Sequence, residues 1–355
     1  MTDQPRRAPS EDAWDDAYER GFADKLYADE EEPLSRYQAN RPEEPQVQWE
    51  NEEYHGYRRH GRKKRRLWRA LLVIAVLILC LFGLHQLLLR QPKGEATGRK
   101  QGSTTILLAG TDESGDRTDT IMLLNVDREA KRISLLSIPR DTWVNSTYTP
   151  HKINIAYGVN GKGESGMDAL MDYVADCVGF RPDGYLLVEL DVFIDLVDLF
   201  GGVDFDVPCA MDYDDPSQGL SIHLQPGMQT LDGYAAMGVV RFRSGYAMAD
   251  LERVNVQRDF MKAAMEQWAR VGNIGKLPRA ISLVLDHATT DLSSGNLLWL
   301  AESVALCKEM NMLTVPYTLD ATYVYIDPTE DYLNTINTCF TPYEQEVTRA
   351  DLVLP

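Results

Sequence analysis

A long apolar run constrains this chain more than any other feature, because a helix this apolar is unstable in water. Residues 70–89 read ALLVIAVLILCLFGLHQLLL, and only His85 and Gln86 carry polar side chains there. A helix of about 20 residues spans about 30 Å at about 1.5 Å per residue, which matches the hydrocarbon core of a bilayer. The sequence therefore predicts one transmembrane helix over residues 70–89.

A dense basic block precedes this run and predicts its orientation. Residues 58–69 carry eight Arg and Lys side chains and no acidic one, whereas residues 90–100 carry four. The positive-inside rule then predicts a single-pass protein of the cell membrane, with a cytoplasmic N-terminus and an extracytoplasmic remainder. A cleaved signal peptide is the alternative, which is weakened by the long segment before the run and by the lack of an A-x-A site.

The charge of the chain argues against a nucleic-acid partner, since the formal net charge is −18. Residues 1–57 hold 16 acidic and 6 basic side chains without a sustained apolar period, so we predict a disordered acidic cytoplasmic tail. Residues 58–69 are expected to be a basic juxtamembrane segment. Residues 91–103, rich in Gly, Lys and Gln, are expected to be a linker.

The rest of the chain alternates short apolar runs with helical patterns. This alternation predicts an α/β domain over residues 104–320, with three αβα layers and a central mixed β-sheet covered on both faces. Residues 321–355 are expected to add a strand and helix extension. Strands are expected at residues 105–109, 120–126, 133–138, 185–188, 203–207, 312–315 and 322–326, with helices at 167–178, 192–200, 253–271, 277–285, 331–339 and after a Ser294 cap.

One stretch gathers cationic side chains at regular spacings. Arg241 and Arg243 would leave the same face of a strand. Asp250, Arg253 and Gln257 are three and four residues apart, so they would share one side of a helix. One guanidinium group can donate two parallel hydrogen bonds to two oxygens of a phosphate. Converging arginines therefore indicate a phosphate or pyrophosphate site. The alternative is three solvated arginines, with Asp250 capping the helix.

Carboxylates stand where two of the expected strands meet. Asp112 follows the first strand, and Arg117 and Asp119 lead into the second. Two carboxylates at adjoining strand ends can share Mg²⁺, or Mn²⁺, which prefers oxygen ligands. The alternative is that both are turn residues that bond the local backbone.

Two further cations follow the third strand. Arg140 comes directly after Pro139, and Lys152 lies twelve residues beyond it. Together with the acidic pair and the arginines, they are the groups that phosphoryl transfer requires: ligands for a metal on the phosphate and cations that neutralise charge in the transition state. An exposed Arg–Asp pair of little energetic value is the alternative for Arg140. The sequence contains none of the common P-loop, zinc-protease, nucleophile-elbow or Rossmann motifs.

Eight short motifs in order give the chain a family resemblance. It resembles the LytR-CpsA-Psr family of cell-wall glycopolymer ligases over about residues 104–271. The motifs are residues 107–112 (LLAGTD), 117–120 (RTDT), 137–141 (SIPRD), 152–154 (KIN), 201–203 (GGV), 231–233 (LDG), 241–243 (RFR) and Asp250 with Arg253 and Gln257.

The resemblance implies an enzyme of a Gram-positive-type envelope. Such a transferase moves a teichoic acid, capsule or similar glycopolymer from polyprenyl pyrophosphate to the muramic acid 6-hydroxyl of peptidoglycan, and forms a phosphodiester. A polyprenyl pyrophosphate hydrolase and a non-enzymatic wall-polymer-binding or regulatory protein are the alternatives. Two departures from the family pattern are Glu252, where glycine is common, and Met237-Gly238.

The resemblance also implies roles for particular residues. Asp112 and Asp119 would hold the metal, and Asp250 would orient Arg253 or accept the proton of the attacking hydroxyl. Catalytic residues would be Asp112, Asp119, Arg140, Arg241, Arg243 and Asp250, and substrate-binding residues Arg117, Arg140, Lys152, Arg241, Arg243, Arg253 and Gln257.

The family also encloses the prenyl chain in an apolar tunnel. Its lining here could include Leu190, Phe193, Ile194, Val197 and Leu199, for which ordinary core packing is the alternative.

Four cysteines lie beyond the apolar run, at positions 177, 209, 307 and 339. Outside the cell they would allow three full disulfide pairings, and free thiols are the alternative.

Overall fold

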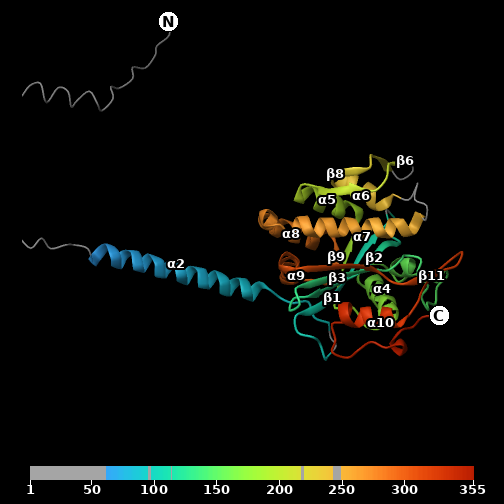
Figure 1. Ribbon diagram of the computed structural model, residues 1–355, viewed down its shortest axis with the longest axis horizontal. Helices are drawn as coiled ribbons and strands as arrows, with labels where there is room; N and C mark the ends of the chain where they lie inside the picture. Colours follow the sequence, from blue (N-terminus) through green and yellow to red (C-terminus); the bar gives the residue numbers. More distant parts are fainter. Residues whose placement is uncertain (1–60, 95–96, 113, 217–219, 243–248) are drawn as a thin grey trace, which may run out of the picture. The chain divides into compact units, whose positions relative to one another are not determined.

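The computed structural model describes residues 61–94, 97–112, 114–216, 220–242 and 249–355 (Figure 1). The chain divides into two compact units, Met1–Leu67 and Trp68–Pro355. The predicted acidic tail over residues 1–57 lies outside the described residues, as does Arg243. Helix α2 runs over Gly61–Leu88. A search of the described part of the chain finds no helix that is long and apolar enough to span a membrane.

A six-stranded mixed sheet forms the centre of the second unit. Its order is β10-β3-β2-β1-β4-β9. Strand β1 is parallel to β4, β3 is parallel to β10, and β2 is antiparallel to both β1 and β3. The ends of β1, β3 and β4 therefore share one edge of the sheet with the start of β2. The strands are β1 (Ser103–Thr111), β2 (Thr118–Asp127), β3 (Arg132–Ser137), β4 (Gly184–Val188), β9 (Thr289–Thr290) and β10 (Glu309–Thr314).

One face of this sheet packs on α4 (Gly163–Val178) and α10 (Glu330–Thr335). Side chains such as Leu107 and Leu123 are completely buried there, against Met167 of α4. The other face packs on α7 (Ala249–Trp268) and α9 (Ser294–Leu306), which contribute Met265 and Trp299. Figure 1 shows α7 and α4 on opposite sides of the sheet. The predicted α/β fold with a covered mixed sheet is confirmed.

A second core lies beyond α7, on the side away from the sheet. It joins α5 (Leu190–Phe200) and α6 (Gly233–Arg241) to two small antiparallel strand pairs, and Phe260 of α7 is buried within it. One pair is β5 (Val203–Val207) with β8 (Gly227–Leu231), and the other is the hairpin of β6 (Met211–Asp215) and β7 (Leu220–Leu224). Strands β6, β7 and β8 were not predicted, because their apolar residues alternate with exposed polar ones and form no continuous run.

The remaining elements are short, except for α8. They are η3 (Ile153–Ile155), α3 (Ala156–Val159), η4 (Val271–Lys276), α8 (Leu277–His287), β11 (Tyr317–Leu319), β12 (Val324–Ile326), the π-helical turn η5 (Ile336–Phe340) and η6 (Arg349–Asp351). Most predicted elements agree with these bounds within a few residues. The cap of α9 was predicted one residue too late: the capping residue is Ser293 and not Ser294. The Ser293 side chain accepts a hydrogen bond from the Asn296 backbone. Cys177, Cys209, Cys307 and Cys339 are all free.

The strand predicted around Arg241 is wrong, because α6 continues through that residue. The Asp232 carboxylate accepts a hydrogen bond from the Ala235 backbone N–H at 2.8 Å and caps the helix. Ala236 and Val239 are completely buried in the second core, so tertiary packing favours the helix. The apolar residues before Arg241 belong to this buried helical face.

The segment predicted as a linker is held against the domain by a buried carboxylate. Asp183 pairs with Arg99 and accepts hydrogen bonds from the Gly94 backbone at 3.2 Å, the Thr104 hydroxyl at 3.0 Å and the Thr105 backbone at 2.8 Å. Its side chain is fully buried. Because a buried charge without partners is costly, these donors tie the segment to the start of β1.

Removing this carboxylate tests its contribution to the fold. Asp183→Ala is expected to destabilise the protein by about 3–5 kcal/mol, because the Arg99 guanidinium then loses its buried counter-ion. The matched control, Asp168→Ala, removes an exposed carboxylate from Arg181 and should cost at most about 1 kcal/mol. Thermal unfolding of the full chain measures both, and equal losses of Tm would contradict the assignment.

A charged cluster joins β6 to β7. Asp212 faces His223 across the hairpin, and Asp214 faces Ser221. The His223 Nδ1 atom lies 2.6 Å from Asp212 Oδ1, and Ser221 Oγ donates to Asp214 Oδ1 at 2.6 Å. The hydrogen bond to Asp212 and the negative charge of Asp214 raise the pKa of His223 above its usual value. These cross-strand pairs help to fix the register of the hairpin.

The raised pKa makes the hairpin dependent on pH. A group whose pKa is higher in the folded state adds stability that is complete below the unfolded-state pKa and lost as pH rises through the folded one. NMR titration should therefore give His223 a pKa above that of a histidine peptide, and amide exchange in β6 and β7 should accelerate above it. Asp212→Asn should shift that pKa back toward the usual value. A pKa at or below the peptide value would contradict the cluster.

Candidate active site

Strand direction brings the predicted site residues together at one edge of the sheet. Asp112 directly follows β1, and Arg140 lies three residues after β3, which runs in the same direction. Asp119 is the second residue of β2, which runs the opposite way and so starts at the same edge. Glu189 follows the parallel strand β4. Ligands commonly bind at this edge of α/β sheets.

A β-bulge sets the position of Asp119. Along β1, Gly110 pairs with Thr120, but the next residue, Thr111, pairs with Thr118. Asp119 is thus the extra residue on β2, and the pairing shifts around it. Bulges often re-aim a side chain next to a functional site, and this one gives Asp119 a place at the cavity described below.

The Asp112 carboxylate organises the turn between β1 and β2. Its Oδ1 atom accepts hydrogen bonds from Ser114 Oγ at 2.8 Å and from the backbones of Asp116 and Arg117 at 3.2 and 3.3 Å. Within the described residues, each hydrogen bond to this carboxylate ends on Oδ1. Asp112 is therefore a turn residue that bonds the local backbone through Oδ1, as the alternative predicted. It also lines the cavity.

Arg140 is held over the start of β2 by an ion pair. Its Nη1 atom lies 2.7 Å from Asp119 Oδ1, and the two side chains are only 18% and 26% exposed. Directly after Pro139, a turn forms in which the Thr142 N–H donates to the Pro139 carbonyl at 3.0 Å. The Asn154 N–H donates to the Arg140 carbonyl at 3.1 Å, which fixes the backbone from which the guanidinium leaves.

Helix α7 forms the opposite wall. Arg253 is 1% exposed, and Gln257 Nε2 donates to the Val240 carbonyl at 2.9 Å, which joins α7 to the end of α6. Arg241, the last residue of α6, places Nη1 3.8 Å from the Met237 sulfur. Asp250 belongs to the first turn of α7, and its side chain is outside the described part of the structure.

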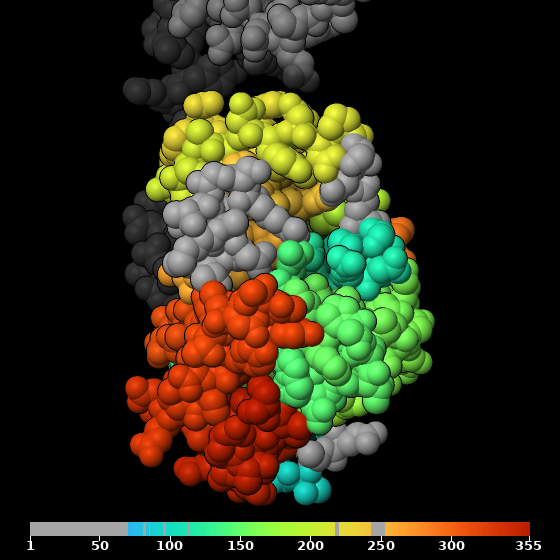
Figure 2. Space-filling model, turned by 90° about the vertical axis from the view of Figure 1, so that its right-hand side faces the viewer, coloured from blue at the N-terminus to red at the C-terminus, as the bar shows by residue number. Residues whose placement is uncertain are grey.

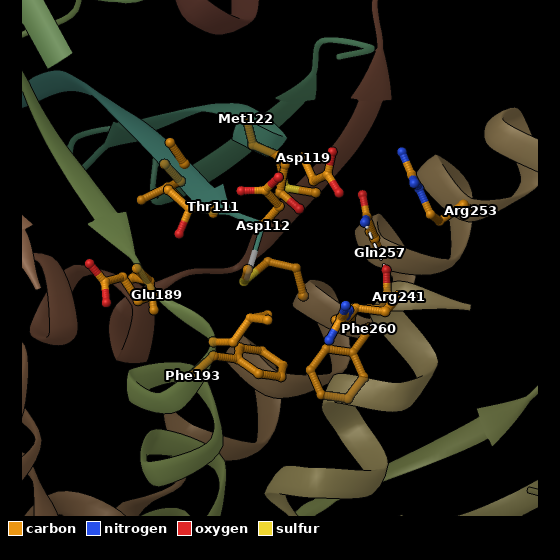
Figure 3. Close-up of a pocket in the computed structure, with 18 of the residues that line it drawn as sticks. Thr111, Asp112, Asp119, Met122, Glu189, Phe193, Arg241, Arg253, Gln257 and Phe260 are labelled. Carbon is orange, nitrogen blue, oxygen red and sulfur yellow. Dashed lines mark hydrogen bonds between the residues drawn. The ribbon is translucent and has the colours of Figure 1, made fainter. Parts of the chain in front are cut away.

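These residues line one cavity of about 530 Å³. Figure 3 shows Asp112 and Asp119 together at one end, with Arg253 and Gln257 across from them on α7 and Arg241 next to Phe260. In Figure 2 the surface is hollowed between the yellow segment near residues 211–235 and the teal turn after β1, and the orange of α7 shows inside.

The other part of the cavity is apolar. Leu108 of β1 and Leu186 and Val188 of β4 are only partly buried because they face the cavity and not a helix. Phe193 of α5 lies 5.8 Å from Phe260 of α7, measured between ring centroids. The apolar lining also includes Leu190, Leu196, Tyr213, Leu220, Met261, Ala264 and Trp268.

The structure brings together most, but not all, of the predicted site residues. Lys152 is not in the cavity lining. Its Nζ atom pairs with Asp141 Oδ1 at 3.1 Å. Of the five predicted tunnel residues, Leu190 and Phe193 line the cavity, whereas Val197 is completely buried in the second core. The predicted residues in the lining are Asp112, Arg117, Asp119, Arg140, Arg241, Arg253 and Gln257.

Several residues of the lining were not among the predicted site residues. The stripe of Arg253 and Gln257 continues along α7 through Phe260, Ala264 and Trp268, at spacings of three and four. Helical periodicity carried past Gln257 would have found these three residues. Glu189 directly follows the strand predicted at residues 185–188, and this position would have found it. Tyr213 had no comparable signal, because its place depends on how β6 packs.

The acidic end of the cavity fits a divalent cation that keeps part of its own solvent shell. Asp112 and Asp119 supply carboxylate oxygens at the same end of the cavity. The described residues contain no group of three or more Asp, Glu, His or Cys side chains arranged for a metal. Mg²⁺ commonly binds through one or two carboxylates and takes its remaining ligands from substrate phosphates and water. The donor set therefore suits Mg²⁺ better than a metal that needs a complete protein cage.

The sequence is similar to those of several named cell-wall proteins. It is 30% identical over 269 residues to the polyisoprenyl-teichoic acid–peptidoglycan teichoic acid transferase TagU of Oceanobacillus iheyensis, and the match covers 72% of this chain and 81% of TagU. It is 34% identical over 218 residues to the probable cell wall biosynthesis protein LcpB of Corynebacterium glutamicum, covering 60% of this chain and 50% of LcpB.

The fold has a counterpart among solved structures. The crystal structure of B. subtilis TagV matches with a TM-score of 0.55 at 25% sequence identity, covering 67% of this chain and 95% of the TagV chain. The model of the LytR_cpsA_psr family matches residues 84–341, which span the central sheet, the cavity and both flanking helical layers. The chain therefore belongs to the LytR_cpsA_psr family.

Proposed function

We propose that this chain is a membrane-anchored phosphotransferase that moves an anionic glycopolymer from polyprenyl pyrophosphate to peptidoglycan. One observation carries the proposal: a single cavity joins a charged end, with carboxylates and arginines, to an apolar end. The proposed donor likewise joins a charged part to an apolar part, because its pyrophosphate links the sugar polymer to a lipid chain. The transferase name of the relative TagU supports the assignment.

The length of α7 suits such a donor. From Arg253 to Trp268 the helix rises by fifteen residues, or about 22 Å at about 1.5 Å per residue. The pyrophosphate would bind beside Arg253, and the first isoprene units would lie along Phe260 toward Trp268. Burial of apolar surface at about 25 cal/mol per Å² would then hold the lipid, while the guanidinium groups bind phosphate oxygens.

The reaction is a displacement at phosphorus. The oxygen of an acceptor hydroxyl bonds to the phosphorus next to the sugar, the phosphoanhydride bond breaks, and polyprenyl phosphate leaves. Arg140, Arg241 and Arg253 neutralise the charge that builds on the phosphate oxygens. Asp119 orients Arg140 through their ion pair. The hydroxyl proton passes to a carboxylate, and Asp250 stays the predicted candidate either for accepting it or for orienting Arg253.

We further propose that Asp112 and Asp119 hold Mg²⁺ or Mn²⁺ beside the pyrophosphate. The ion would neutralise phosphate charge and stabilise the leaving group. The apolar run over residues 70–89, which lies in α2 up to Leu88, would anchor the chain in the cell membrane with the catalytic domain outside.

Arg241 is the first residue to test. Arg241→Ala is expected to lower the transfer rate by about 100-fold or more, because one charge that stabilises the transition state is lost. Arg258→Ala is the matched control: this arginine of α7 does not line the cavity and lies beside Asp259 and Thr314. The assay follows transfer from a defined lipid-linked donor to peptidoglycan oligomers, with thermal unfolding as the check on folding. Wild-type transfer by Arg241→Ala would remove Arg241 from the catalytic role, whereas no transfer by the wild-type protein itself would favour a protein that only binds the polymer.

The metal proposal has its own measurement. Excess chelator should abolish transfer, and added Mg²⁺ should restore it. Asp112→Asn should raise the half-saturating Mg²⁺ concentration by about tenfold or more, since loss of a mere supporting residue already costs 10- to 100-fold in affinity. The control is Asp116→Asn in the same turn, whose carboxylate pairs with Lys162 at 2.6 Å. Full activity in excess chelator would remove Asp112 and Asp119 from this role.

A further inference from the structure

The segment after α7 exposes apolar side chains. Val271 and Ile274 are 81% and 56% exposed, and η4 contributes no buried residue. Residues three apart lie on the same side of a 3₁₀-helix, so these two side chains project together. On α8, Leu285 is a further 40% exposed. Gathered apolar exposure of this kind marks a contact site more often than a random surface does.

The same segment is cationic in an otherwise acidic protein. Residues 269–281 contain Arg270, Lys276 and Arg279 and no acidic residue, while the whole chain carries a net charge of −18. Arg270 and Arg279 are exposed. Apolar side chains flanked by cations suit a bilayer with anionic headgroups, because the apolar groups enter the interface and the cations meet the lipid charge.

This segment also lies at the apolar end of the cavity. Trp268 lines the cavity and stacks on Phe200 at a centroid distance of 4.8 Å. Lys276, the last residue of η4, donates to the Phe200 carbonyl at 2.8 Å. The Lys276 hydrogen bond thus joins η4, with its exposed Val271 and Ile274, to the stacked rings of Phe200 and Trp268 at the apolar end of the cavity. A prenyl chain that leaves a bilayer at η4 would meet the cavity with little contact with water.

The attachment of α2 places this end of the domain near the membrane. Helix α2 ends at Leu88, and the Arg90 N–H already donates to the Gly295 carbonyl at 3.2 Å, while Asn296 Nδ2 donates to the Arg90 carbonyl at 2.8 Å. Two residues reach at most about 7 Å. Gly295 lies at the start of α9, which follows α8 by a short connection, and Figure 1 shows α8 and α9 at the same end of the domain.

We propose that residues 270–279 form a docking surface for an anionic bilayer. Val271 and Ile274 insert into the interface, Arg270 and Arg279 bind anionic headgroups, and the apolar end of the cavity is thereby held against the lipid. This inference rests on the proposed membrane anchor and lipid-linked donor, and it adds a second contact between the domain and the membrane.

Hydrogen exchange of the full chain in nanodiscs tests the surface without relying on activity. Amides of residues 270–279 should exchange about tenfold more slowly in anionic than in neutral nanodiscs, since each Arg or Lys near an anionic surface adds appreciable attraction. Ile274→Asp and Arg270→Gln should each remove the difference. Leu319→Asp, at an exposed apolar residue of β11, should leave it intact. Equal exchange in both nanodiscs would overturn the proposal, as would protection that follows protein concentration and so reveals contact with a second copy.

Transfer assays separate this proposal from the proposed function. Ile274→Asp should lower transfer from a long-chain donor embedded in anionic nanodiscs by about tenfold and leave transfer from a short-chain, water-soluble donor unchanged. Leu319→Asp should match the wild type with both donors. If neither donor is turned over by the wild type, the proposed function fails while the exchange result still decides the docking surface. If Ile274→Asp matches the wild type with both donors, the docking surface fails alone.

Discussion

Guanidinium groups that share one cavity repel each other, and the carboxylates placed among them decide whether the site can exist. Like charges repel more strongly near a protein surface than in bulk water, because the effective dielectric constant is lower there. The ion pair between Arg140 and Asp119, at 2.7 Å, offsets part of this repulsion in the free protein. The positive charges opposite Asp112 and Asp119 are the reason for which we propose an anionic substrate accompanied by a cation.

Strand direction explains why these charges meet at all. Asp112, Asp119 and Arg140 are spread over 29 positions of the sequence, yet each stands at the same edge of the sheet. A position at this edge is not enough to direct the Asp119 side chain into the cavity. The bulge opposite Thr111 shifts the strand pairing at Asp119 and so re-aims its side chain. Backbone pairing fixes the acidic end, whereas the position of the arginines on α6 and α7 depends on the packing of the second core.

This division also explains what the sequence could predict. The covered sheet follows from continuous apolar runs such as residues 120–126, and the carboxylates at its edge follow from their place beside those runs. The helical state of Arg241 did not follow, because local β-preference was overridden by burial of Ala236 and Val239. Tyr213 reaches the cavity through tertiary packing alone, which no local pattern encodes.

One rigid helix couples the two ends of the cavity, and this has a geometric consequence. Arg253 and Trp268 belong to α7, so the rise along the helix between the charged end and the apolar end of the cavity is fixed at about 22 Å. If η4 rests on the bilayer and α7 points away from it, the charged end lies well above the headgroups. A pyrophosphate at that height can meet a peptidoglycan hydroxyl only if several isoprene units leave the membrane with it. Burial of those units along α7 offsets the cost of removing them from lipid, which is why the apolar lining and the charged end have to occur in the same cavity.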